Sequence, residues 1–173
     1  MSEGPIERFY AAFARRDGTA MAACYAPDAR FSDPVFGKLQ AEEAGAMWRM
    51  LTGGAQELEV ELLEHTDHGE WGTARWRASY VFTQTGRPVV NEVFAAFRLD
   101  DGLIAEHADS FSFKAWAAQA LGRHARVPGT LRVLRAAVRR RARRRLQEFM
   151  AGERDTAPAG QLPATPRPEP GAP

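Results

Sequence analysis

His107 and Asp109 are the residues of this chain whose types and spacing best suit proton-transfer chemistry. The segment 103–113 alternates in character as a strand does, and residues two apart on a strand point to the same face. Ala105 and Phe111 share that face and are small or apolar. An imidazole and a carboxylate on an apolar wall can act as general acid or base, typically contributing about 10²–10⁴ in rate. The alternative is a structural pair that only stabilises the fold.

Three further polar residues are candidates for the same site. Asp33 follows a short strand and precedes a proline, so it could act as a second acid or simply bond its own turn backbone. Asn91 lies in a central strand, where asparagine is unfavourable without a partner. Its amide could orient His107 or a ligand oxygen, or bridge neighbouring strands. The hydroxyl of Tyr80 could donate a hydrogen bond to an oxyanion.

Aromatic residues alternate along the predicted strand 71–83 and are candidates to contact a ligand. Trp76, Tyr80 and Phe82 share one face of it, and ordinary core packing is the alternative, which is favoured for Phe82. Phe111 and Tyr25 complete the candidate ligand-binding set. Arg75 and Arg77 belong to the opposite face and are dimer-interface or rim residues if that face is the outer one. If the two faces are inverted, Arg77 becomes a pocket cation.

No metal site or cofactor is expected. A zinc site needs three or four converging ligands, and the chain has one cysteine, Cys24. Beyond His107, its histidines are His65, His68 and His124, which are predicted in turns or linkers.

Hydrophobic periodicity predicts helices first and then a run of strands, which is the order typical of an α+β domain. Apolar residues at helical spacing and turn residues such as Asp100-Asp101-Gly102 set the boundaries. The predicted helices are 6–16, 19–25 and 41–51; the predicted strands are 29–32, 57–64, 71–83, 89–99 and 103–113; and a short helix follows, ending at Gly122.

Four segments within residues 5–122 resemble the nuclear transport factor 2-like superfamily, in particular its SnoaL-like and ketosteroid-isomerase-like branches. They are 9–13 (FYAAF), 25–34 (YAPDARFSDP), 85–91 (TGRPVVN) and 101–111 (DGLIAEHADSF). The resemblance implies a cone-shaped, curved antiparallel sheet wrapped by three N-terminal helices, with a pocket between them and Asp33 near its mouth. It also implies a homodimer through the outer sheet face. Isomerases, hydrolases, polyketide cyclases, dehydratases and non-enzymes share this fold, so the fold alone does not give the activity.

Charge divides the chain into unlike parts. Residues 1–122, the expected cone domain, carry 11 basic and 18 acidic side chains, whereas 123–145 carry ten arginines and no acid. This arginine-rich stretch belongs to a predicted helical extension, 123–152. Residues 153–173 are rich in proline and are predicted to be a disordered tail. The basic helix could pack its Leu131, Leu134 and Val138 stripe on the domain, bind nucleic acid by charge, or lie on an anionic membrane. The packed helix is favoured, because no stacking aromatic is interleaved with its arginines and its apolar stripe is narrow.

The sequence therefore predicts a cytoplasmic, small-molecule-binding SnoaL-like protein. No apolar run approaches the ~18–20 residues of a membrane span, and neither membrane contact nor specific nucleic-acid binding is expected. One hypothesis is an enzyme that transfers protons or activates water on a small apolar oxygenated substrate, as an isomerase, hydrolase or cyclase does. The alternative is a non-catalytic ligand-binding and dimerisation module, with a basic-helix adaptor as a third hypothesis.

Overall fold

The computed structural model describes residues 3–54, 56–122 and 130–156, which form five helices and six strands. The helices are α1 (Pro5–Ala14), α2 (Gly18–Ala22), α3 (Ala41–Gly54), α4 (Phe113–Leu121) and α5 (Leu131–Thr156). The strands are β1 (Tyr25–Asp33), β2 (Gly37–Gln40), β3 (Gln56–Asp67), β4 (Trp71–Phe82), β5 (Arg87–Asp100) and β6 (Leu103–Ser110).

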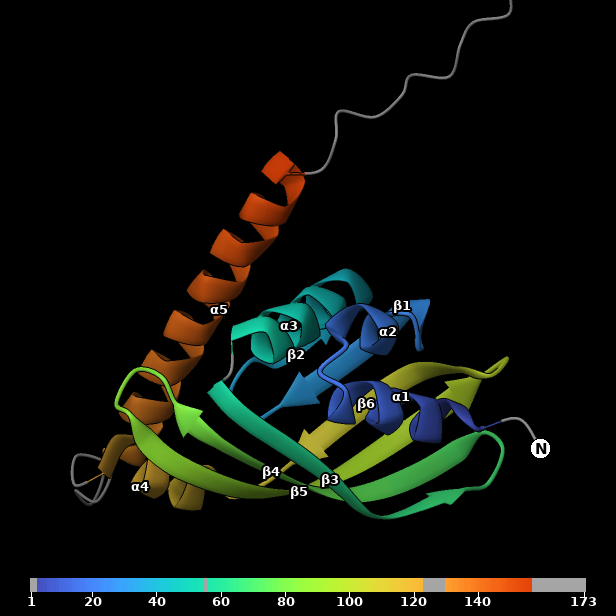
Figure 1. Ribbon diagram of the computed structural model, residues 1–173, viewed down its shortest axis with the longest axis horizontal. Coiled ribbons are helices and arrows are strands. Elements are labelled where there is room, and N and C mark those ends of the chain that lie inside the picture. Colours follow the sequence, from blue (N-terminus) through green and yellow to red (C-terminus); the bar gives the residue numbers. More distant parts are fainter. Residues whose placement is uncertain (1–2, 55, 123–129, 157–173) are drawn as a thin grey trace, which may run out of the picture.

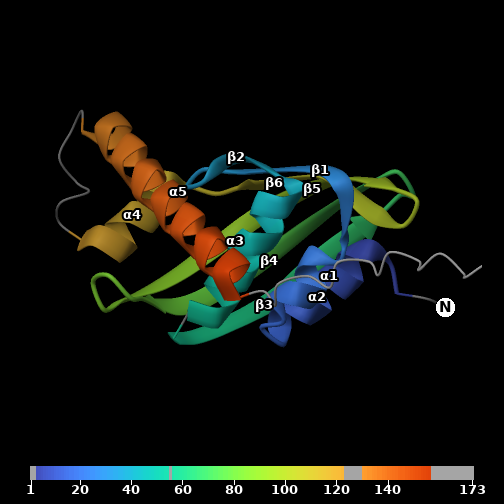
Figure 2. The same ribbon diagram turned by 90° about the horizontal axis from the view of Figure 1, so that it is seen from above.

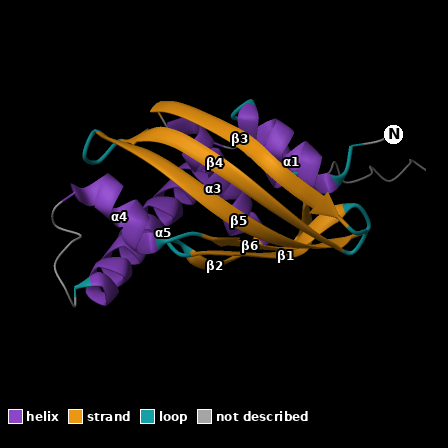
Figure 3. Ribbon diagram, turned by 90° about the horizontal axis from the view of Figure 1, so that it is seen from below, coloured by secondary structure: helices purple, strands orange, loops and turns teal. Residues whose placement is uncertain are grey.

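One curved sheet in the order β2-β1-β6-β5-β4-β3 forms the framework. Its neighbours are antiparallel, except that β1 runs parallel to β6. Helices α1, α2 and α3 lie on the concave side of the sheet (Figures 1 and 3). The predicted α+β cone, wrapped by three N-terminal helices, is confirmed.

Local sequence explains the elements that matter for the site. Pro5 occupies the first turn of α1, where its missing N–H is not needed, and the Glu7 side chain accepts a hydrogen bond from the Gly4 N–H at 3.1 Å. In β5, Val93 and Phe97 are buried whereas Glu92 is exposed, the alternation of a strand with one face in the core. That alternation fixes which side chains of the sheet face the helices.

Two features of the fold differ from the sequence predictions. The sequence does not predict β2, because only Leu39 is buried among the four residues of this strand, which leaves no alternating pattern. The strand is defined by its pairing with β1. β1 begins at Tyr25 rather than at residue 29, and its parallel register sets Phe31 beside His107. The Phe31 ring therefore forms part of the surroundings of the His107 imidazole.

Helix α5 crosses the open end of the cone and packs on the rest of the molecule (Figures 1 and 2). Its Leu131, Leu134 and Val138 stripe lies against an apolar cluster centred on α4. Leu146 is 1% exposed and belongs to the main core. The sequence interpretation of a helix packed on the domain agrees with this placement.

The end of α5 also differs from the predicted domain boundary. The helix continues to Thr156, four residues into the stretch predicted as tail. Glu153 forms a bidentate ion pair with Arg49 of α3, with N–O distances of 2.7 and 2.8 Å, and this pair holds the extra turn. The rest of the predicted tail, 157–173, and the first part of the predicted helical extension, 123–129, lie outside the described residues.

Among the described residues, no helix is both long enough and apolar enough to cross a membrane.

Candidate functional site

A cavity of about 250 Å³ lies between the concave sheet face, α3 and α5. Its wall is predominantly apolar, with a few polar groups from the sheet, which is the usual character of a small-molecule site. The wall includes seven of the residues singled out from the sequence: Asp33, Trp76, Tyr80, Phe82, Asn91, Asp109 and Phe111. The candidate residues His107 and Tyr25 do not line it.

Asp109 is the polar group of β6 that reaches this cavity. Its side chain is buried, with the residue 8% exposed. Oδ1 lies 3.0 Å from His107 Nε2 and accepts a longer hydrogen bond from Trp76 Nε1 at 3.4 Å. Oδ2 makes no hydrogen bond to any described residue, so this oxygen is available to a molecule in the cavity. The carboxylate is thus held by one oxygen and free at the other.

A chain of buried hydrogen bonds leads away from Asp109 through His107 and Tyr25 to Trp48. Trp48 Nε1 donates to the Tyr25 hydroxyl at 2.9 Å, and that hydroxyl lies 2.7 Å from His107 Nδ1. An indole N–H can only donate, so the Tyr25 oxygen is the acceptor of the Trp48 bond. With the Tyr25 proton directed at Nδ1 and Nε2–H donating to Asp109, every member of the chain has a partner.

His107 lies behind Asp109 in a cage of aromatic rings and is 1% exposed. Its ring centroid lies 4.3 Å from that of Phe97, 5.1 Å from Phe31 and 5.3 Å from Phe9. The prediction that His107 faces a ligand directly is therefore wrong in geometry. Aromatic rings of α1 and of the parallel strand β1 cover the imidazole. Asp109, two residues further along β6, lines the cavity.

Tyr25 requires the same correction. It was predicted to contact a ligand, but its residue is 7% exposed and its hydroxyl is occupied by Trp48 and His107. Burial, as the largest cause, raises the pKa of Tyr25 well above its usual value. Tyr25 is thus a neutral link in the buried chain, and it positions His107.

Asp33 combines the two roles that the sequence left open. Its Oδ1 accepts hydrogen bonds from the backbone N–H groups of Val35, Phe36 and Gly37 at 2.9, 2.5 and 3.3 Å, which is the turn role. The residue also lines the cavity. Burial raises the pKa of Asp33 to about 7, and the nearby charge of Asp109 adds to the rise while the three backbone N–H groups oppose it. A carboxyl group with this pKa is partly protonated at neutral pH.

Asn91 and Tyr80 face the cavity beside the two acids. The Asn91 side-chain amide makes no hydrogen bond within the described part of the chain, and both His107 nitrogens have other partners, so this amide does not orient the imidazole. The Tyr80 hydroxyl accepts from Trp116 Nε1 at 2.9 Å, and burial raises its pKa. Both side chains keep hydrogen-bonding capacity for a ligand oxygen.

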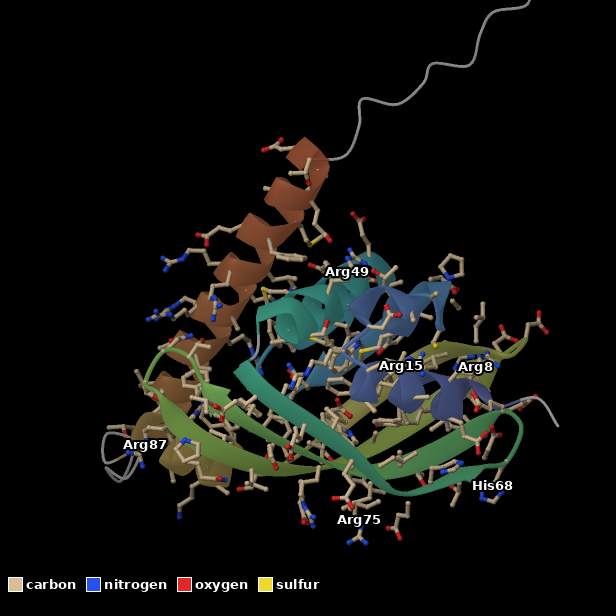
Figure 4. All side chains as sticks on the ribbon, viewed as in Figure 1. Arg8, Arg15, Arg49, His68, Arg75 and Arg87 are labelled. Carbon is tan, nitrogen blue, oxygen red and sulfur yellow. The ribbon has the colours of Figure 1, made fainter. Side chains whose placement is uncertain are left out.

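The strand face opposite the cavity carries the charged residues, as predicted. Arg77 forms ion pairs with Glu61 and Glu92, with N–O distances of 3.2 and 2.7 Å. Arg75 pairs with Glu64 and projects from the convex side of the sheet, away from the helices (Figure 4). Neither arginine is a cavity cation.

Sequence reasoning missed the contribution of α5 to the cavity wall. Val138, Arg141, Ala142 and Arg145 all line it. They lie three or four positions apart, so they share one helix face. That spacing was a visible signal, but only the docked position of the helix reveals what the face covers.

Metal-ligating clusters are not seen in the described ranges: no group of three or more His, Cys, Asp or Glu side chains could hold an ion. His65 lies 3.3 Å from a Glu7 oxygen. His124 falls in 123–129 and is outside the described residues.

Solved structures share this architecture. A protein with a ketosteroid isomerase-like fold from Catenulispora acidiphila, in complex with trimethylamine, matches with a TM-score of 0.62 and 15% identity over 74% of this chain and 100% of that one. An NTF2-like protein from Burkholderia thailandensis matches at 0.60 with 25% identity, over 69% and 98% of the two chains. An LEH-like epoxide hydrolase from M. tuberculosis matches at 0.57 with 19% identity, over 68% and 86%.

No curated protein sequence matches the chain. The family model of the SnoaL-like domain matches residues 6–107, more than half of the chain. This match runs from the first turn of α1 to His107 within β6. With the six-stranded curved sheet and its three covering helices, it identifies the chain as a member of the SnoaL-like domain family, within the nuclear transport factor 2-like superfamily.

Proposed function

We propose that this protein binds a small, largely apolar, oxygenated molecule in its cavity and transfers a proton to or from it through Asp109. The observation that carries the proposal is a buried carboxylate with one oxygen held by His107 and the other open to an apolar cavity. A general base needs this combination of fixed orientation and an accessible lone pair. His107, Tyr25 and Trp48 act on the reaction through Asp109 and are positioning residues.

Asp33 supplies the complementary acid. With a pKa of about 7 it carries a proton in a substantial fraction of molecules at neutral pH, and it lines the same cavity as Asp109. Two carboxyl groups in unlike environments are the usual basis for assigning acid and base roles. Asp109 would take a proton from the substrate or from an attacking water, and Asp33 would deliver one to the developing oxyanion. Tyr80 and Asn91 can add hydrogen bonds to that oxygen.

The test is turnover of epoxides, ketosteroids and polyketide-like ketones by the wild type and by Asp109→Asn. We expect kcat on any substrate that is turned over to fall by about 10²–10⁴ in the variant. Glu106→Gln is the matched control, because Glu106 lies on the same strand, is exposed and pairs with Arg98 outside the cavity. Equal activity and an unchanged pH–rate profile in Asp109→Asn would contradict the proposal. Tight retention of a ligand with no turnover would instead support the non-catalytic binding module.

We also propose that two copies associate through the outer sheet face. Trp71, Val90 and Phe94 are 59%, 50% and 50% exposed on the convex side. Large apolar groups this exposed are typical of interaction surfaces. The ion pairs of Arg75, Arg77 and Arg98 lie on the same strands, so the surface has a mixed, interface-like composition.

A further inference from the structure

Two arginines of α5, Arg141 and Arg145, contribute to the cavity wall without a partner of their own. Both are exposed, which places their head groups at the cavity rim. Neither makes an ion pair or hydrogen bond to any described residue. Other arginines of the helix are occupied: Arg143 binds Glu43 and two backbone carbonyls, and Arg144 pairs with Glu148.

The helix that carries this pair is fixed on the domain. Arg143 donates to the carbonyls of Phe36 and Lys38 at 3.0 and 2.5 Å, which ties α5 to the β1–β2 turn. Leu146 is almost fully buried, and Glu153 holds the far end against Arg49. The unpaired guanidinium groups are therefore held over the cavity by a docked element rather than by a loose tail.

The charge of the cavity is distributed unequally. The sheet supplies two carboxyl groups, Asp109 of β6 and Asp33 at the end of β1, and α5 supplies two guanidinium groups at the rim. An anionic group beside the acids would be repelled, whereas at α5 it would meet two unpaired cations with a planar geometry suited to carboxylate or phosphate. A neutral apolar body would fill the remaining space between them.

We infer that the ligand is an organic anion, whose carboxylate or phosphate group is recognised by Arg141 and Arg145 while its apolar body lies in the cavity. This deepens the proposed function, on which it rests, by naming the chemical class of the substrate. It assigns the arginine-rich helix a role in ligand recognition rather than in binding to a macromolecule. The pair selects the ligand and takes no part in the proton transfer.

The experiment compares one ring system with different head groups. Binding of 2-naphthoate, 2-naphthyl phosphate and the neutral methyl 2-naphthoate is measured by calorimetry at low ionic strength. We expect at least one anion to bind about tenfold more tightly than the ester, a preference that shrinks as salt is added. The two anions distinguish a carboxylate from a phosphate ligand.

Variants assign the preference to the two rim arginines. Arg141→Gln with Arg145→Gln should abolish the preference and leave affinity for the ester unchanged, which also shows that the cavity is intact. The corresponding lysine pair should retain part of the preference, because it keeps the charge and loses the planar donor geometry. The matched control is Arg132→Gln with Arg140→Gln, which removes the same charge from exposed residues of α5 that do not line the cavity.

Three results would overturn the inference: neither anion preferred over the ester, the preference surviving in the glutamine pair, or an equal loss in the control pair. Each of these, with ester binding intact, leaves the proposed Asp109 chemistry standing. Failure of the ester to bind at all would count against the cavity itself. An unchanged turnover in Asp109→Asn would contradict the proposed function and not the anion preference.

Discussion

Replacing Tyr25 by phenylalanine tests the buried chain that positions the candidate base. The substitution keeps the ring but removes the hydroxyl that joins Trp48 Nε1 to His107 Nδ1. Both partners are buried, and water does not reach them. Each buried polar group left without a partner costs about 1–3 kcal/mol, so we expect the free energy of unfolding to fall by about 2–6 kcal/mol.

Tyr10 offers a matched control in the same core. Its residue is 3% exposed, and its hydroxyl is buried with no hydrogen-bond partner among the described residues. Tyr10→Phe removes a hydroxyl that is already desolvated and unpaired, so the free energy of unfolding should stay constant or rise by about 1 kcal/mol. The two variants delete the same atom from the same residue type, and only the network differs.

Urea unfolding followed by tryptophan fluorescence measures both variants under identical conditions, with m-values checked for constancy. We expect Tyr25→Phe to be less stable than Tyr10→Phe by at least about 2 kcal/mol. Equal stabilities for the two variants would refute the hydrogen-bond chain. Loss of stability confined to Tyr10→Phe would refute it equally.

Three further predictions concern the cavity acid, the docked helix and the outer face. Asp33 has a pKa of about 7 in the folded state and an ordinary one when unfolded, so the folded state binds its proton more tightly. The wild type should therefore lose stability relative to Asp33→Asn as pH rises from about 4 to 7, by up to about 4 kcal/mol in urea unfolding. A difference in free energy of unfolding that stays constant across that range would contradict this. A double-mutant cycle of Arg49→Met and Glu153→Gln should give a coupling energy of about 1 kcal/mol, because the pair is bidentate but one-third exposed, and a coupling of zero would mean that it does not hold α5. Phe94→Glu should convert the proposed dimer to a monomer in analytical ultracentrifugation, whereas an unaffected dimer would exclude the outer sheet face.

The face of each strand could be predicted from the sequence, because the period of two in a strand is a local property. Asp109 and Trp76 lie on the cavity side and Arg77 on the outer side as that period requires. The depth of a side chain within its face is not local. His107 shares the face of Asp109, yet rings from α1, β1, α3 and β5 surround it. One of them is Phe31, which lies beside His107 through a parallel strand pairing that alternation along a single strand does not predict.

The residues that α5 contributes to the cavity wall could not be predicted from the sequence either. Arg141 and Arg145 looked like part of a solvated basic face, because nothing local distinguishes them from Arg140. Only the docking of α5 across the open end of the cone, through Arg143 and Leu146, brings them to the cavity. Similarly, the environment that raises the pKa of Asp33 depends on burial by segments remote from its turn.

The proposed proton transfer requires the free oxygen of Asp109 to face an apolar ligand, and a crystal structure with bound 2-naphthol would show whether it does. We expect the naphthyl rings in the cavity between the sheet, α3 and α5, with the hydroxyl donating to Asp109 Oδ2 at about 2.7 Å. Rings bound on the convex sheet face, or in the cavity with the hydroxyl turned away from Asp109, would contradict it.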